Sequence, residues 1–162
     1  MASNVEIMGL RTTPNGDEHD KDVALAIRYA VDNGAHIINM SFGKDLSPQK
    51  EFVDDAIRYA EEHGVLIVNS SGNSGRDLSE EPTYPNKTYL DGTIASNVIT
   101  VGASERILDK NVPAVFSNYG KGIVDILAPG VDIVSTDTSN TYSEHSGTSF
   151  SGPVVSLSLI HI

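Results

Sequence analysis

The residues whose types and spacing most clearly suggest a chemical reaction lie near the end of the chain. The segment reads Gly147-Thr148-Ser149-Phe150-Ser151-Gly152-Pro153. A serine hydroxyl that acts as a nucleophile needs small neighbours, because the substrate must approach it closely and the backbone must turn sharply beneath it. An ordinary Ser/Gly loop has the same composition. The segment alone therefore supports either interpretation, and the rest of the chain must decide between them.

The composition is that of an ordinary globular protein and disfavours several classes of function. The chain has 162 residues, 39% hydrophobic and 20% charged, which is enough for one domain with a buried core. Its 22 acidic and 11 basic residues give a formal net charge of −11, which argues against binding to nucleic acid or to an anionic membrane surface. No apolar run reaches the roughly 18 residues of a membrane-spanning helix, so we expect no membrane insertion. The absence of cysteine excludes disulfides and thiolate chemistry.

Two similar helix–strand units follow one another in the first half of the chain. The pentapeptide Ala-Ile-Arg-Tyr-Ala occurs at residues 26–30 and again at residues 56–60. We expect Asp20 to cap the first helix and Ser47 the second, with Gly34 and Gly64 ending them. Consecutive units of this length build a parallel α/β sheet, and the polar ends of their strands meet at the edge where such sheets bind ligands.

Short apolar runs predict the remaining strands. The predicted strands cover residues 5–10, 36–40, 65–68, 98–101, 112–116, 123–127 and 131–135. Residues 76–96 show no periodicity, and their length indicates a functional rim rather than a plain connection. A helix should begin after Ser149.

Several stretches, taken in order, resemble the subtilisin-like serine proteases, or subtilases. They are residues 38–43, 70–73, 101–103, 116–120, 128–131 and 147–153. The first resembles the strand whose edge binds the substrate backbone, the second the strand end that carries an oxyanion-binding asparagine, and the last the nucleophile motif. The resemblance covers roughly residues 5–156. It implies an α/β fold with a mostly parallel sheet flanked by helices, here incomplete.

The same resemblance assigns roles to individual residues. Ser149 would be the nucleophile of a serine endopeptidase that works through an acyl-enzyme, and Asn73 would donate a hydrogen bond to the oxyanion. The polypeptide substrate would be bound by the backbone of Ser41, Phe42 and Gly43 and by a pocket wall of Ser70, Ser71 and Gly72. From the residues alone, Asn73 fits an ordinary Asn-Ser-Gly turn and residues 41–43 fit a loop exit. The chemistry requires no cofactor or metal, although a structural calcium ion on backbone carbonyls is compatible with the family.

The motifs that carry the Asp and His of the subtilase triad have no counterpart in this sequence. His145 lies four residues before Ser149, but on the leaving-group side of the family's cleft, so we do not expect it to act as the base. We therefore interpret residues 1–156 as part of a subtilase catalytic domain that is inactive by itself. The alternative is a non-catalytic module that binds peptides. A Gly-x-Ser-x-Gly hydrolase is disfavoured, because Ser151 stands where the second glycine belongs.

The last six residues, 157–162, depart from the family pattern. They match a translated sequencing-adapter end, and we hypothesise that they are not native and that the sequence is truncated at both ends. Resequencing the source locus tests this hypothesis. The family also implies a secreted or cell-envelope location, whereas the oligomeric state has no signal in the sequence.

Overall fold

A parallel four-stranded sheet forms the centre of the molecule. The computed structural model describes residues 4–13, 16–106 and 112–160. The strands are β1 (Ile37–Met40), β2 (Leu66–Ser70), β3 (Val98–Ser104) and β4 (Ile126–Pro129), hydrogen-bonded in the order β1-β2-β3-β4. All three pairings are parallel, which confirms the predicted α/β fold.

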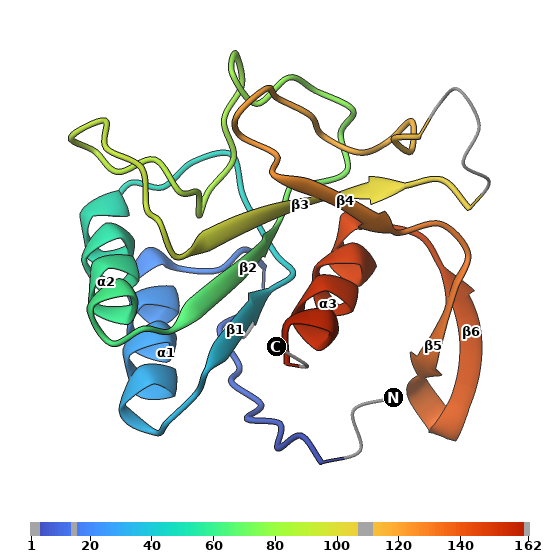
Figure 1. The fold of residues 1–162 in the computed structure, drawn as a ribbon, viewed down its shortest axis with the longest axis horizontal. Helices are drawn as coiled ribbons and strands as arrows, with labels where there is room; N and C mark the ends of the chain where they lie inside the picture. Colours follow the sequence, from blue (N-terminus) through green and yellow to red (C-terminus); the bar gives the residue numbers. More distant parts are fainter. Residues whose placement is uncertain (1–3, 14–15, 107–111, 161–162) are drawn as a thin grey trace.

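Helices cover both faces of this sheet (Figure 1). α1 (Asp20–Asp32) and α2 (Lys50–Glu62) lie on one face, and α3 (Thr148–Leu159) lies on the other. Neighbouring residues of β2 show the division, because successive side chains of a strand point to opposite faces. Ile67 is fully buried in the cluster formed with α1 and α2, and Val68 is fully buried in the cluster that contains Val155 of α3.

A two-stranded hairpin stands apart from the sheet at the right of Figure 1. It consists of β5 (Ile133–Asp137), a short 3₁₀ turn (Thr138–Asn140) and β6 (Thr141–His145), paired antiparallel. The sequence predicted a strand only at residues 131–135. β6 was missed because its sequence, Thr-Tyr-Ser-Glu-His, lacks the apolar residues that mark a buried strand.

Two predicted strands are wrong. Residues 5–10 belong to no strand, and Ile7 is 92% exposed. Residues 112–116 form turns and a single isolated bridge between Pro113 and Ser104. A strand needs a continuous ladder of hydrogen bonds to a neighbour. Among the described residues, 5–10 have no such ladder, and 112–116 make only separate bonds, two to the end of β3 and one to Gly75.

The glycines predicted to end the two helices are correct, but the residues predicted to cap their starts are not. Gly34 and Gly64 follow α1 and α2 with φ of +82° and +70°, the left-handed conformation expected of a glycine that ends a helix. Neither Asp20 nor Ser47 is a cap. Asp20 lies inside the first turn of α1, and its carboxylate accepts hydrogen bonds from Ser47 Oγ and Gln49 N, both at 2.8 Å.

The Asp20 carboxylate joins α1 to the loop that leaves β1. Lys44 Nζ lies 2.7 Å from Asp20 Oδ1 and donates to the carbonyl of Glu18 at 2.6 Å. Burial raises the pKa of Asp20, but the hydrogen bonds from Lys44, Gln49 and Ser47 outweigh it, so the pKa is lowered overall. This network fixes the position of residue 44 relative to the helices.

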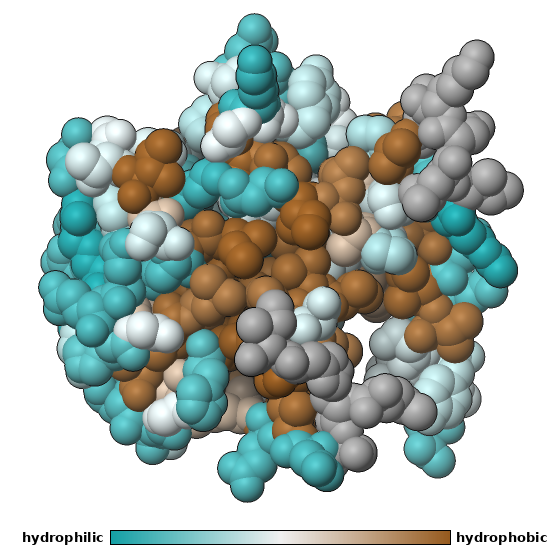
Figure 2. All heavy atoms as spheres, viewed as in Figure 1, coloured by the Kyte–Doolittle hydropathy of each residue, from teal (hydrophilic) through white to brown (hydrophobic). Residues whose placement is uncertain are grey.

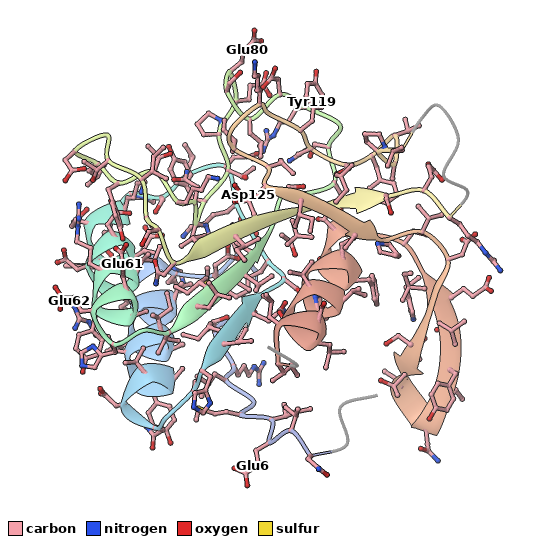
Figure 3. The ribbon with its side chains drawn as sticks, in the orientation of Figure 1. Glu6, Glu61, Glu62, Glu80, Tyr119 and Asp125 are labelled. Atoms are coloured by element: carbon pink, nitrogen blue, oxygen red, sulfur yellow. The ribbon has the colours of Figure 1, made fainter. Side chains whose placement is uncertain are left out.

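The long segment between β2 and β3 is held to α2 by Glu61, which is labelled in Figure 3. Glu61 accepts hydrogen bonds from Ser96 N at 3.0 Å, from the Ser96 hydroxyl and from the Tyr89 hydroxyl at 3.1 Å. Burial and the bond to Glu61 raise the pKa of Tyr89. The predicted rim at residues 76–96 is therefore irregular in backbone but anchored at its far end.

On the face seen in Figure 2, hydrophilic residues lie around the periphery and apolar residues across the middle. In the described part of the chain, no helix combines the length and apolar character needed to cross a membrane. Residues 157–159 continue α3, with Leu159 packed on the core and Leu157 half exposed. Residues 161–162 lie outside the described residues, and the non-native origin of 157–162 stays a prediction.

Replacing Asp20 with Asn should lower the free energy of unfolding at pH 7 by about 3 kcal/mol, because the buried Lys44 charge loses its partner. The lowered pKa means that the stabilisation is complete above the ordinary aspartate pKa of about 4 and is lost as the pH falls through the folded-state value. Urea unfolding at pH 7 and pH 3 should show the gap between wild type and Asp20→Asn narrowing in acid. Asp55→Asn, at an exposed position of α2, is the matched control. An equal gap at both pH values would contradict this account.

Candidate active site

The amino-terminal end of α3 lies against the carboxyl ends of β1 and β2, and Ser149 lies in its first turn. Ser149 Oγ donates to the carbonyl of Ser41 at 3.1 Å, and Ser41 Oγ donates to the carbonyl of Ser149 at 2.9 Å. Pro153 makes the second bond available. It has no N–H for the carbonyl four residues earlier, so the Ser149 carbonyl lacks its usual helical partner and accepts from Ser41 instead.

Asn73 leaves the end of β2 and points its side chain at the start of α3. Its Oδ1 accepts from Thr148 N at 2.8 Å and from Thr148 Oγ1 at 2.9 Å. With the oxygen occupied, the Nδ2 group is the end of the amide left to donate. Within the described part of the chain it has no acceptor.

The backbone N–H of Ser149 is also free to donate. The first N–H groups of a helix have no acceptor inside the helix. Here Thr148 N donates to Asn73 and Phe150 N donates to the carbonyl of Gly147 at 3.1 Å. Among the first three, only the N–H of Ser149 has no acceptor within the described residues. It lies at the positive end of the α3 dipole, which favours a developing negative charge.

Thr148 holds these donors in place, a role that the sequence did not reveal. It is 1% exposed, and its Oγ1 accepts from Gly72 N at 3.1 Å while its carbonyl accepts from Ser70 Oγ at 3.0 Å. A hydroxyl residue at a helix start was the available signal. That signal does not say which strand end the residue contacts.

The side chain of Asn118 fixes the loop after β2 through hydrogen bonds to its backbone. Its Oδ1 accepts from Ser74 N at 2.9 Å and Arg76 N at 3.2 Å, and its Nδ2 donates to the carbonyl of Ser71 at 2.8 Å. Gly72 makes this approach feasible, because a Cβ at that position would lie 2.5 Å from Asn118 Nδ2. The φ of +101° at Gly72 also disfavours any other residue. The sequence placed Asn118 only in a framework segment.

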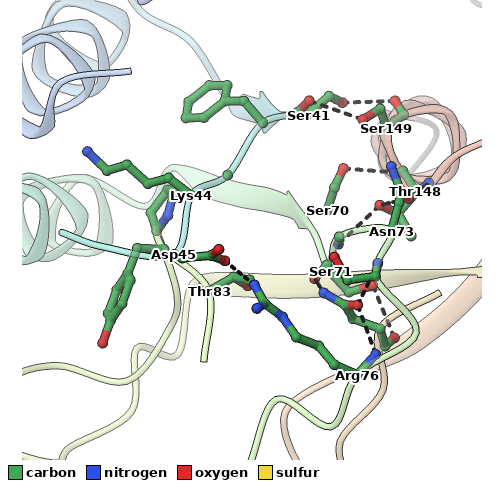
Figure 4. A pocket seen from close by; sticks show the side chains of 17 residues that line it. Ser41, Lys44, Asp45, Ser70, Ser71, Asn73, Arg76, Thr83, Thr148 and Ser149 are labelled. Atoms are coloured by element: carbon green, nitrogen blue, oxygen red, sulfur yellow. Dashed lines mark hydrogen bonds and ion pairs between the residues drawn. The ribbon is translucent and has the colours of Figure 1, made fainter. Parts of the chain in front are cut away.

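A cavity of about 290 Å³ opens beside Ser149 (Figure 4). One wall is formed by the residues that follow β1, and the other by the end of β2 and the residues that follow it. The lining includes all eight site residues that the sequence predicted. They are Ser41, Phe42, Gly43, Ser70, Ser71, Gly72, Asn73 and Ser149. The structure thus brings every predicted site residue together. Their roles in binding and catalysis stay predictions.

The two walls differ in what they can offer a ligand. The hydroxyls of Ser70 and Ser71 are engaged with the carbonyls of Thr148 and Asn118, so these serines shape the wall rather than bind through their side chains. Phe42 and Gly43 make no backbone hydrogen bond with other described residues. Their peptide groups are therefore available to an added strand.

His145 lies close to the nucleophile motif but makes no hydrogen bond to Ser149. Its ring stacks on Phe150 with a centroid distance of 5.2 Å, and its Nε2 lies 2.7 Å from Ser143 Oγ and 3.6 Å from Asp137 Oδ2. The hydrogen bond from Ser143 lowers the pKa of Asp137. Across the described ranges, no histidine or carboxylate is hydrogen-bonded to Ser149, and no group of three or more His, Asp or Glu side chains could hold a metal ion.

Comparison with known proteins agrees with this arrangement. The family model described as "Subtilase family" matches residues 1–162. The chain belongs to the subtilase family. It is 41% identical over 156 residues to the thermophilic serine proteinase of Bacillus sp. (strain AK1), covering 96% of this chain and 35% of that protein. It is 37% identical to the cell wall-associated protease of Bacillus subtilis (strain 168), covering 94% and 15%.

Solved structures agree with the sequence comparison. The prenylagaramide maturation protease PagA superposes with a TM-score of 0.73 at 32% identity, covering 91% of this chain and 50% of that one. The chain therefore spans half or less of each of these three proteins.

Replacing Gly72 with Ala should destabilise the subtilase fold through both backbone strain and the contact with Asn118. Gly92 is a matched control, since its φ is +81° but a Cβ there would meet nothing within 4 Å. We expect Gly92→Ala to cost about 1–2 kcal/mol from the backbone alone. Gly72→Ala should cost about 2 kcal/mol more, because the hydrogen bonds of Asn118 are disturbed. Urea unfolding measures both, and equal losses would show that the close approach to Asn118 is unimportant.

Proposed function

We propose that this chain carries the nucleophile and the oxyanion-binding donors of a serine endopeptidase. The observation that carries the proposal is the pair of hydrogen bonds by which Thr148, the residue before Ser149, binds the side-chain oxygen of Asn73. It leaves one side-chain N–H and one backbone N–H free beside the Ser149 hydroxyl. Family membership supports the same activity.

In the proposed reaction, Ser149 Oγ attacks the carbonyl carbon of the scissile peptide bond. The hydroxyl proton passes to a base, and the carbonyl oxygen becomes an oxyanion that accepts from Asn73 Nδ2 and the N–H of Ser149. As the C–N bond breaks, the proton moves to the leaving amine and an ester remains on Ser149. Water then hydrolyses the ester. In subtilisin, a member of this family, loss of the corresponding asparagine lowers kcat by about 10²–10³.

The substrate in this proposal is an extended polypeptide. Its backbone would pair with the peptide groups of Phe42 and Gly43, as an added strand pairs with the edge of a sheet. The side chain before the scissile bond would enter the cavity between residues 41–45 and 70–76.

The base and its orienting carboxylate are proposed to come from polypeptide outside these residues. Ser149 Oγ donates to the carbonyl of Ser41, which can hold the hydroxyl but cannot accept its proton in a reaction. The same contact favours the second candidate function, a peptide-binding module without catalysis, for the chain in isolation.

We propose an extracellular or cell-envelope location, because one relative is named a cell wall-associated protease and the family membership points the same way. Acyl transfer by a serine needs no cofactor. A structural calcium ion bound through backbone carbonyls stays a prediction.

The 162-residue chain alone should not be labelled stoichiometrically at Ser149 by a fluorophosphonate, because no base activates the hydroxyl. Joining residues 1–156 behind the matching amino-terminal part of the thermophilic serine proteinase should restore labelling and peptide hydrolysis. Ser149→Ala should abolish both, and Asn73→Leu should lower kcat by about 10²–10³ with little change in KM.

Two outcomes of that experiment would count against the proposal. Stoichiometric labelling of the isolated chain would show that it holds its own base. A well-folded chimera that binds peptide but does not cleave it would favour the binding module.

A further inference from the structure

The end of the cavity away from Ser149 is closed by an ion pair. Figure 4 shows Arg76 reaching from the β2 side towards Asp45 on the β1 side, with Ser149 at the opposite end. Arg76 Nη2 is hydrogen-bonded to Asp45 Oδ1, and Nη1 lies 3.6 Å from Glu81 Oε2. The guanidinium therefore spans the two walls.

Arg76 is the cation that this cavity can offer to a ligand. The other cationic residue in the lining, Lys44, is held by Asp20 and by the carbonyl of Glu18. The backbone of Arg76 is fixed, since its N–H donates to Asn118 Oδ1 and its carbonyl accepts from Tyr119 N at 3.0 Å. The side chain thus starts from a rigid point and ends inside the cavity.

The carboxylates that pair with Arg76 are placed so that a ligand can replace them. The side chains of Asp45 and Glu81 are 72% and 68% exposed, whereas that of Arg76 is 22% exposed. An ion pair with a partner so exposed contributes little to stability, because water solvates the carboxylate nearly as well. A carboxylate inside the cavity would meet the guanidinium in a more enclosed place, where a bidentate charge-assisted bond is stronger.

We propose that Arg76 selects substrates with an acidic side chain immediately before the scissile bond. This inference rests on the proposed function, which places that side chain in the cavity. On binding, the substrate carboxylate replaces that of Asp45 beside the Arg76 guanidinium, and the Asp45 side chain rotates towards the solvent. A basic side chain that pairs with Asp45 and Glu81 is the opposite outcome, and the greater burial of Arg76 argues against it.

The test uses three fluorescent pentapeptides that are identical except for a last residue of Glu, Leu or Lys. Each ends in a free carboxylate, so each mimics the acyl product of cleavage. Fluorescence anisotropy with the 162-residue chain should show the Glu peptide binding about tenfold more tightly than the Leu peptide, and the Lys peptide binding most weakly. Arg76→Gln should remove the preference for Glu. Asp45→Asn should widen it several-fold, because the competing carboxylate is gone.

Arg58→Gln is the matched control. Arg58 lies on α2, outside the cavity lining, and pairs with Asp91 of the segment between β2 and β3. Its replacement should leave all three affinities unchanged. Circular dichroism confirms that each variant is folded. Tightest binding of the Lys peptide, or a Glu preference that survives Arg76→Gln, would overturn the inference.

The same data separate this inference from the proposed function. Equal binding of all three peptides would overturn the role of Arg76 alone. Failure of every peptide to bind would overturn both, because the peptides share the backbone that residues 41–43 are proposed to hold.

Discussion

The contact between Thr148 and the end of β2 is the constraint on which the site depends. Thr148 is buried and binds Asn73 through both its N–H and its hydroxyl, while its own oxygens accept from Gly72 and Ser70. These partners lie about 75 residues earlier in the chain, so they set the position of α3 relative to the sheet. Because Ser149 follows directly, the same bonds position the proposed nucleophile and orient the Asn73 amide. One buried side chain thereby couples the fold to the chemistry.

Close backbone approach is the second requirement. Gly72 lets Asn118 pass beneath the loop after β2, and a Cβ at Gly130 would lie 2.4 Å from Ser151 Oγ and 2.6 Å from Ala103. α3 therefore packs directly on the sheet. Pro153 completes the arrangement by releasing the Ser149 carbonyl to Ser41. The helix loses one internal hydrogen bond and gains a bond to Ser41, which follows β1 and forms part of one cavity wall.

Much of this was accessible from the sequence, because local patterns carry it. The repeated pentapeptides and the glycines that follow them predicted α1, α2 and the parallel sheet. The order of motifs predicted that Asn73, Ser149 and the residues of both cavity walls meet at one edge. The roles of Thr148 and Asn118 could not be predicted, since each depends on partners tens of residues away. The polar strand β6 was missed, and residues 5–10 were wrongly predicted to be a strand, for a related reason. Pairing decides whether a run becomes a strand, and apolar content alone does not report pairing.

In the proposed reaction, Asn73 Nδ2 and the Ser149 N–H point at the place where the oxyanion develops. A crystal structure of the chimera with a fluorophosphonate bonded to Ser149 tests it most directly, since the phosphoryl oxygen stands in for the oxyanion. We expect one phosphoryl oxygen about 2.7–3.1 Å from both nitrogens, with Asn73 Oδ1 still bound to Thr148. A phosphoryl group attached to Ser149 whose oxygens contact neither nitrogen would contradict the account.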